Sequence, residues 1–270
     1  MSTQREERIK VELEKIREAA EQGIVEAQYD LANMYEHGEG VEQSNTEAIT
    51  WFMKAAEQGD AESRLRLEKI YEKSHSLRGY GKALIAAEQG DAEGEYKIGM
   101  LFLEDDDSGD YGINRNNAIA FRWIHKAAEK GHVAAQNRLA WMYARGKGVE
   151  INWKLSFEWS LKAAEQGLAA AQHTLGAMYA QGLGTDKDDE LATEWYRKSS
   201  EQSYMPALKG LDLMVDKKIA CAQYNWGMLF EIGVAPYIKK DIAGAIKWYQ
   251  KAAEQGYIKA QKRLAELDIL

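Results

Sequence analysis

Apolar residues recur along this chain in groups spaced by four positions, the spacing of one buried face of an α-helix. Each group begins with a small residue, which suits a place where two helix backbones come close. The small residues are Ala27, Ser63, Gly94, Ala135, Ala171, Ala207, Ala222 and Ala260. Four positions later stand Leu31, Leu67, Ile98, Leu139, Leu175, Leu211, Trp226 and Leu264, and eight positions later Tyr35, Tyr71, Phe102, Tyr143, Tyr179 and Phe230. We therefore expect one helix, called helix A, in each copy.

A second helix, called helix B, is expected after each helix A. A glycine that can cap helix A in the left-handed conformation follows in four copies, as Gly38, Gly146, Gly182 and Gly233. Helix B then carries tryptophan at one register, four positions before a pair of small residues. These tryptophans are Trp51, Trp123, Trp159, Trp195 and Trp248. We expect them to be interior plugs between consecutive repeats.

Helix B ends in the phrase Ala-Ala-Glu-Gln-Gly, which is intact at Ala19–Gly23, Ala55–Gly59, Ala86–Gly90, Ala163–Gly167 and Ala252–Gly256. The interval is 36 residues from Ala19 to Ala55, from Ala127 to Ala163 and from Ala163 to Ser199. A fixed period of this size is typical of a stacked array, because one helix pair cannot bury its apolar face alone. The sequence therefore predicts an all-α solenoid of about seven repeats, with a helix at each end as a cap.

The pattern Ala-x3-Leu-Gly/Ala-x2-Tyr-x2-Gly, followed by a Gly-Val loop and by Trp-Tyr-x-Lys-Ala-Ala-Glu-Gln-Gly, resembles the Sel-one-like repeat. Ala171–Ser203 and Ala222–Gly256 match it closely, and the resemblance covers nearly the whole chain. It implies a right-handed superhelix of antiparallel helix pairs, akin to tetratricopeptide arrays, with a concave protein-binding surface. Many relatives are secreted and carry two cysteines per repeat. This chain departs from that pattern, which argues against the periplasmic branch.

The regular spacing divides the chain into an N-terminal capping helix over 1–23, five repeats over 24–203, an irregular truncated segment over 204–221, and a last repeat with a capping helix over 222–270. In the irregular segment either helix B is missing or an extra short helix lies outside the stack. The second repeat, Asp60–Gly90, is compressed to 31 residues. The third, Asp91–Gly131, is lengthened by the acidic stretch Glu104–Asp110, which we interpret as a solvated loop rather than a calcium site.

Composition and charge reduce the number of candidate partners and activities. The net charge of −8 disfavours nucleic acid as a partner, since an acidic surface repels phosphate. No apolar run approaches the roughly 18 residues of a membrane span, so no membrane partner is expected. The single cysteine, Cys221, excludes an intrachain disulfide. No metal-ligand spacing, phosphate-binding loop or catalytic group appears, and we expect no metal, no cofactor and no enzymatic activity.

The candidate binding surface is the stripe of helix A opposite its buried face, at positions two, six and nine after the small residue. These positions vary between copies, so the repeat framework does not dictate them. The candidate residues are Tyr29, Asn33, Tyr96, Met100, Leu103, Asn137, Trp141, His173, Tyr224 and Met228. Aromatic residues and methionine are favoured at interfaces, which suggests a groove centred on the third and fourth repeats for a helix or an extended peptide. The alternative is that these residues pack against neighbouring helices.

These observations favour a cytoplasmic adaptor or regulator that binds another protein or peptide without catalysis. The alternative is a cytoplasmic immunity protein that neutralises a bacterial toxin, a role that some bacterial Sel-one-like proteins resemble. An enzyme acting on cell-wall material would require export, and the start of the chain shows no export signal.

Overall fold

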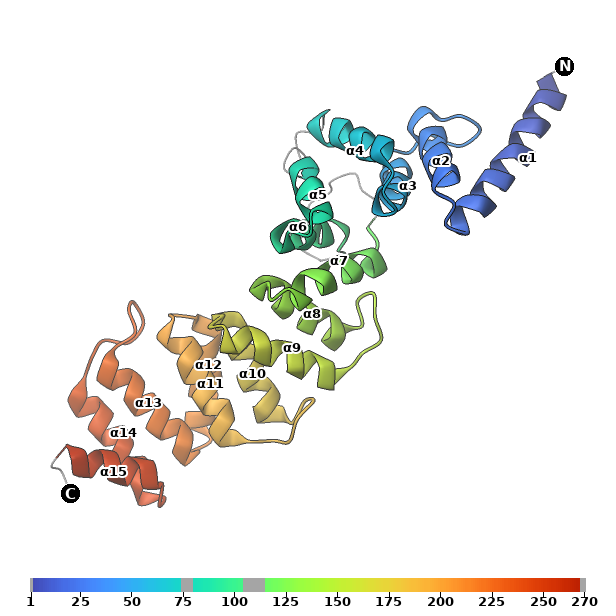
Figure 1. Cartoon of the computed structure of the whole chain (residues 1–270). Helices are drawn as coiled ribbons and strands as arrows, with labels where there is room; N and C mark the ends of the chain where they lie inside the picture. The colour runs from blue at the N-terminus through green and yellow to red at the C-terminus, as the bar shows by residue number, and fades with distance from the viewer. Residues whose placement is uncertain (1, 74–79, 104–114, 268–270) are drawn as a thin grey trace. The chain divides into compact units, whose positions relative to one another are not determined.

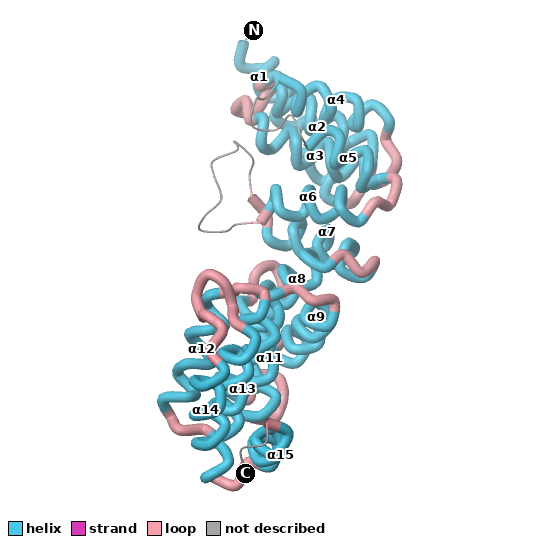
Figure 2. Tube along the Cα trace, turned by 90° about the vertical axis from the view of Figure 1, so that its left-hand side faces the viewer, coloured by secondary structure: helices cyan, strands magenta, loops and turns pink. Residues whose placement is uncertain are grey.

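The computed structural model describes residues 2–73, 80–103 and 115–267. These residues form fifteen α-helices in antiparallel succession, joined by loops (Figures 1 and 2). The chain divides into two compact units, Met1–His132 and Val133–Leu270. The predicted all-α repeat architecture is confirmed.

The first unit contains α1 (Ser2–Glu21), α2 (Val25–His37), α3 (Asn45–Glu57), α4 (Ala61–Lys73), α5 (Tyr80–Glu88), α6 (Ala92–Phe102) and α7 (Asn117–Glu129). The second contains α8 (Val133–Arg145), α9 (Trp153–Glu165), α10 (Ala169–Gln181), α11 (Asp189–Glu201), α12 (Met205–Asp216), α13 (Ala220–Ile232), α14 (Ile242–Glu254) and α15 (Ile258–Glu266). Helices A are α2, α4, α6, α8, α10, α12, α13 and α15. Helices B are α1, α3, α5, α7, α9, α11 and α14. The acidic stretch Glu104–Asp110 lies outside the described residues.

The buried face of helix A is the predicted one at the first two of its three positions. Every small residue at its start is buried, and so is each aliphatic residue four positions later, whereas Trp226 is only half-buried. At the third position, eight residues after the small one, Phe102 and Tyr143 are buried, but Tyr35, Tyr179 and Phe230 are half-buried.

Helix A and helix B of one repeat come very close. A Cβ added to Gly176 would lie 2.8 Å from Tyr196 Cδ1, and one added to Gly227 would lie 2.7 Å from Tyr249 Cε1. In these two repeats a glycine of helix A therefore packs against a tyrosine of helix B.

The prediction that the tryptophans of helix B are interior plugs is only partly right. Trp51 and Trp123 are buried, whereas Trp159, Trp195 and Trp248 are half-buried. In all five copies the residue after the tryptophan is buried: Phe52, Ile124, Ser160, Tyr196 and Tyr249. A lysine three positions after each tryptophan covers its ring, with its Nζ 3.6 to 4.5 Å from the ring centroid. Each indole is thus shielded partly by a lysine chain, with a cation–π contact, and not by the next repeat alone.

The turn from helix A to helix B is closed by the same contacts in every full-length copy. The side chain that caps helix B accepts a hydrogen bond from the first turn of that helix. These caps are Ser44, Asn116, Asn152, Asp188 and Asp241. The backbone N–H of each cap residue also donates to a carbonyl of helix A, that of the aromatic residue eight positions after the small residue. Gly38 and Gly182 take the predicted left-handed conformation, but Gly233 does not: its ψ of 143° directs the chain into a longer loop.

A ladder of side-chain hydrogen bonds links successive repeats. In helix A, the side chain one position after the small residue can donate a hydrogen bond to the preceding Ala-Ala-Glu-Gln-Gly phrase, at the carbonyl of its second alanine. Gln28 donates to Ala20 at 3.0 Å, and Gln172 donates to Ala164 at 3.2 Å. The glutamine of the following phrase then donates to that same residue. These pairs are Gln58–Gln28, Gln166–Gln136, Gln202–Gln172 and Gln255–Gln223, at 2.7 to 2.9 Å. The glutamine of the repeated phrase therefore has a structural function that the spacing alone did not reveal.

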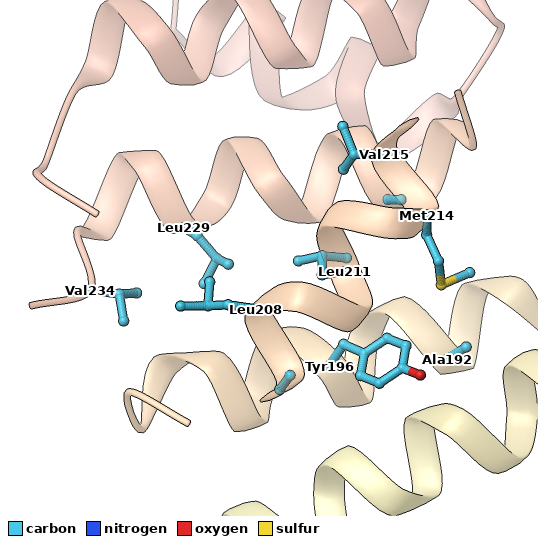
Figure 3. Packing of buried hydrophobic residues seen from close by; sticks show 10 residues of the cluster. Ala192, Tyr196, Leu208, Leu211, Met214, Val215, Leu229 and Val234 are labelled. Atoms are coloured by element: carbon cyan, nitrogen blue, oxygen red, sulfur yellow. The ribbon is translucent and has the colours of Figure 1, made fainter. Parts of the chain in front are cut away.

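The irregular segment forms one helix, α12, which is followed directly by α13, so helix B is missing there. This helix is not outside the stack. Its Leu208, Leu211, Met214 and Val215 are buried in a cluster with residues of α11 and α13. Figure 3 shows Leu208 and Leu229 pointing toward each other from α12 and α13. Both α12 and α13 contact α11.

The last helix, α15, is fixed to α13 by an ion pair. Arg263 donates to both carboxylate oxygens of Glu231, and the Tyr249 hydroxyl donates to Glu231 Oε2 at 2.6 Å. The arginine, together with the Tyr249 hydrogen bond, lowers the pKa of the Glu231 carboxyl, and burial opposes this effect. Ala260 and Leu264 of α15 are buried.

We expect Gln172→Met to destabilise the second unit by about 1–2 kcal/mol, because it removes two hydrogen bonds at a buried position. The matched substitution Gln261→Met removes only a 3.4 Å contact in the exposed last helix and should change stability by less than about 0.5 kcal/mol. Urea unfolding followed by circular dichroism measures both. Equal effects would contradict a stabilising function of the ladder.

We expect the Glu231–Arg263 pair to make stability depend on acid pH. Because the folded pKa of Glu231 lies below the unfolded value, its contribution is complete above the unfolded value of about 4.5 and is lost as pH falls through the folded pKa. Between pH 6 and pH 3 the wild type should therefore lose about 1–2 kcal/mol more than Glu231→Gln. Glu266→Gln, at an exposed carboxylate that contacts the same arginine, is the control. A Glu231→Gln protein with the same pH profile as the wild type would refute the assignment.

Candidate functional site

The predicted helix A stripe is not an open surface. Nine of the ten candidate residues are half-buried. The tenth, Leu103, is fully buried, so its assignment as a partner-binding residue is wrong. Leu103 follows the last residue of α6 in an extended conformation, with φ −73° and ψ 127°, and the helical wheel does not apply to it.

The aromatic residues at the start of the stripe stack on neighbouring helices and turns. The ring of Tyr29 lies 5.7 Å from that of Phe52, and the ring of Tyr96 lies 4.8 Å from that of His132. Tyr224 packs between the rings of Tyr249 and Tyr257, each 5.4 Å away. Part of each of these side chains therefore packs against a neighbouring helix or turn, as the alternative interpretation of the stripe expected.

Three further stripe residues are similarly constrained. His173 lies 5.7 Å from the rings of both Tyr196 and Tyr204, and burial lowers the pKa of its imidazole, so the ring is neutral at neutral pH. Met228 packs on the buried cluster of Ala245, Tyr249 and Leu264. Asn33 has its side-chain oxygen buried without a hydrogen-bond partner.

The remaining stripe residues are Met100, Asn137 and Trp141. All are half-buried, and Trp141 has the Arg138 guanidinium 5.2 Å from its ring centroid. Part of each of these three side chains is exposed.

The structure assembles a second candidate site that the sequence analysis missed, between α12, α13 and the loop 233–241. We call it the α12–α13 groove, and its volume is about 670 Å³. The residues that line it are Met205, Leu208, Lys209, Asp212, Trp226, Phe230, Tyr237, Ile238, Lys239, Lys240 and Asp241. The groove lies beside α12, the helix A that is not followed by a helix B. The regular packing is interrupted there.

Three departures from the repeat framework indicate this groove in the sequence. Trp226 stands where other copies have an aliphatic residue, and Leu208 where most have a glutamine. Ser203 replaces the glycine of the phrase and keeps a positive φ of 63°. Its hydroxyl donates to the Ala235 carbonyl at 2.7 Å, which ties the loop to the turn before α12.

The groove has an apolar floor and a charged rim. Buried Leu208 and half-buried Trp226 and Phe230 form the floor, while Lys209, Lys239 and Lys240 on the rim are exposed. Of the two rim aspartates, Asp241 already accepts a hydrogen bond from Gly244 N at 3.0 Å as the cap of α14. The second unit carries 18 Lys and Arg against 16 Asp and Glu, a net charge of +2, whereas the first carries 17 against 27, a net charge of −10. The groove therefore lies in the basic part of an acidic protein.

The described part of the chain offers little for catalysis. No group of three or more His, Cys, Asp or Glu within it could hold a metal ion. Cys221 is buried, and burial raises the pKa of its thiol, which disfavours the nucleophilic thiolate. Among the described helices none is long and apolar enough to cross a membrane.

Solved structures provide the first comparison. A protective antigen present in uropathogenic Escherichia coli strains, which displays an SLR fold, shares 32% identity over 93% of this chain, with a TM-score of 0.46. This chain spans 58% of the length of that antigen. A Sel1 repeat protein from Oxalobacter formigenes shares 26% identity over 97% of this chain and 81% of its own, with a TM-score of 0.43. A search of curated proteins gave no match.

A family model provides the second comparison. The model described as Sel1 repeat matches residues 25–60, 92–132, 133–168, 169–204 and 222–257. It leaves out 61–91 and 205–221, which are the compressed repeat and the segment of α12. The matches cover well over half of the chain and follow its helix pairs, so this protein belongs to the Sel1 repeat family.

Proposed function

We propose that this protein is a non-catalytic scaffold that binds a partner protein, and that a peptide segment of the partner docks in the α12–α13 groove. Sel1 repeat arrays generally mediate protein interactions. The observation that carries the proposal is the groove itself, a 670 Å³ depression with an aromatic floor inside a rim of exposed lysines. Its volume lies within the range of about 300–1,000 Å³ of binding pockets.

The chemistry of the groove indicates the partner segment. Trp226 and Phe230 offer partly exposed ring faces, which favour an aromatic or aliphatic anchor residue. Lys209, Lys239 and Lys240 favour acidic residues on either side of that anchor. We therefore propose an acidic peptide with one large apolar anchor.

The helix A stripe of the second unit is proposed as a second contact surface. Asn137 and Trp141 are its best candidates, because the other stripe residues of this unit, His173, Tyr224 and Met228, are largely occupied by contacts within the protein.

Peptide display on the intact protein tests the groove. Selection from a random library should enrich acidic peptides with an aromatic residue or leucine. In fluorescence anisotropy, K239E/K240E should weaken the best peptide at least tenfold, and raising the salt concentration should weaken wild-type binding, because exposed charges are screened.

The variant K247E/K262E makes the same charge change at exposed lysines outside the groove and should bind as the wild type does. Enriched peptides without acidic residues, or peptides bound equally by K239E/K240E, would show that the groove is not the docking site. Trp141→Ala should weaken a full partner protein but not the isolated peptide, with helical content unchanged.

The charge of the first unit favours a second candidate function, which is an immunity protein against a basic toxin. Its net charge of −10 would attract a cationic enzyme surface. Co-expression with a basic toxin encoded beside this gene should restore growth, and complex formation should weaken steeply with salt. Continued toxicity at equal expression would exclude this function for that toxin.

A further inference from the structure

A second cavity, independent of the proposed docking groove, lies in the first unit beside the compressed second repeat. Its volume is about 460 Å³, and α3, α4, α5, α6 and α7, with the turn after α5, contribute to its wall. The helix B of this repeat, α5, is described over Tyr80–Glu88. At the register that holds tryptophan in five other helices B it has the exposed Lys82. The repeat therefore lacks the indole that the regular copies place there.

Two buried polar atoms belong to residues of this cavity and have no partner. Glu95, 3% exposed, accepts a hydrogen bond from Lys130 at Oε1 with a distance of 2.7 Å, but its Oε2 accepts none. Trp123, also 3% exposed, has an indole N–H without an acceptor. Buried polar groups without partners are rare and costly, so this arrangement favours a ligand that supplies both partners.

The pair Glu95–Lys130 is itself a departure from the repeat framework. At the same two positions four other repeats have a neutral Gln–Gln pair. Both partners differ here, and the charged pair lies in the repeat that follows the compressed second repeat. A structural bond alone would not need this change, because the neutral pair makes the same link elsewhere in the chain.

The charges around the cavity indicate a ligand with both signs. Positive charge comes from Arg64, Lys126 and Lys130, and negative charge from Glu57, Glu95 and Glu129, of which Glu95 is buried. Lys126 lies over the ring of Trp123, with Nζ 4.5 Å from its centroid. An ammonium group would donate to Glu95 Oε2, and a carboxylate would accept from the Trp123 indole N–H and face these cations.

We propose that this cavity binds a small zwitterion, either a free α-amino acid or the termini of a short peptide. The ammonium group of the ligand pairs with Glu95, and its carboxylate pairs with Trp123 and Lys126. Such a site would make the array responsive to a small molecule in addition to a protein partner.

Nuclear magnetic resonance of the full-length, ¹⁵N-labelled protein tests the proposal, because each of the eight tryptophans gives one indole N–H signal. The signal of Trp123 is identified by its loss in Trp123→Phe. Titration with a panel of L-amino acids, and then of dipeptides, should move this signal downfield in a saturable manner. N-acetylated or C-amidated forms of the ligand that binds should bind at least tenfold more weakly. A response to free amino acids assigns a metabolite site, and a response to dipeptides alone assigns a site for peptide termini.

The variant E95Q/K130Q restores the pair found in the other repeats, so we expect it to fold and to lose binding. The matched variant Q172E/Q202K places the same charges in regular repeats and should not create a site. The proposal is overturned if no zwitterion moves the Trp123 signal, if capped ligands move it equally, or if E95Q/K130Q retains the response.

Discussion

The hydrogen bond from the first turn of helix A to the end of the preceding helix B is the contact on which the array depends. It joins a side chain such as Gln172 to the carbonyl of Ala164, and Gln202 of the following phrase then bonds to the same side chain. Three successive helices are thereby held at one spacing. The small residues beside this bond let the helix backbones come close, and the glutamine of helix A in each pair is buried. Hydrophobic burial supplies most of the stability, but this polar contact fixes the register.

Both candidate binding sites lie where that contact is altered. In α12 the position of the glutamine is taken by Leu208, which cannot donate and which lines the α12–α13 groove. In α6 it is taken by Glu95, which lines the cavity of the first unit. The regular repeats are closed by their own hydrogen bonds and packing. Irregular repeats have unmatched apolar or polar surface, and this surface is available to a ligand.

The two units also differ in electrostatics. The first has a net charge of −10 and contains the ion pair between buried Glu95 and exposed Lys130, whereas the second has a net charge of +2 and presents the lysine rim. A single array can therefore attract ligands of different charge at different repeats. This difference is invisible in the net charge of −8 of the whole chain.

The sequence by itself determined the helix pairs, their buried face and the family, because these follow from spacings that recur at every copy. It also located the irregular repeats, since a broken period is visible without coordinates. Only the tertiary structure decided that Tyr196 and Tyr249, and not the tryptophans beside them, fill the core, and that Leu103 is buried. It alone brought Leu208, Trp226 and the loop 233–241 together, and left Glu95 Oε2 and the Trp123 indole without partners. The physical reason is that periodicity reports which face of a helix is apolar. The residues that share a cavity depend instead on close approach between segments distant in the chain.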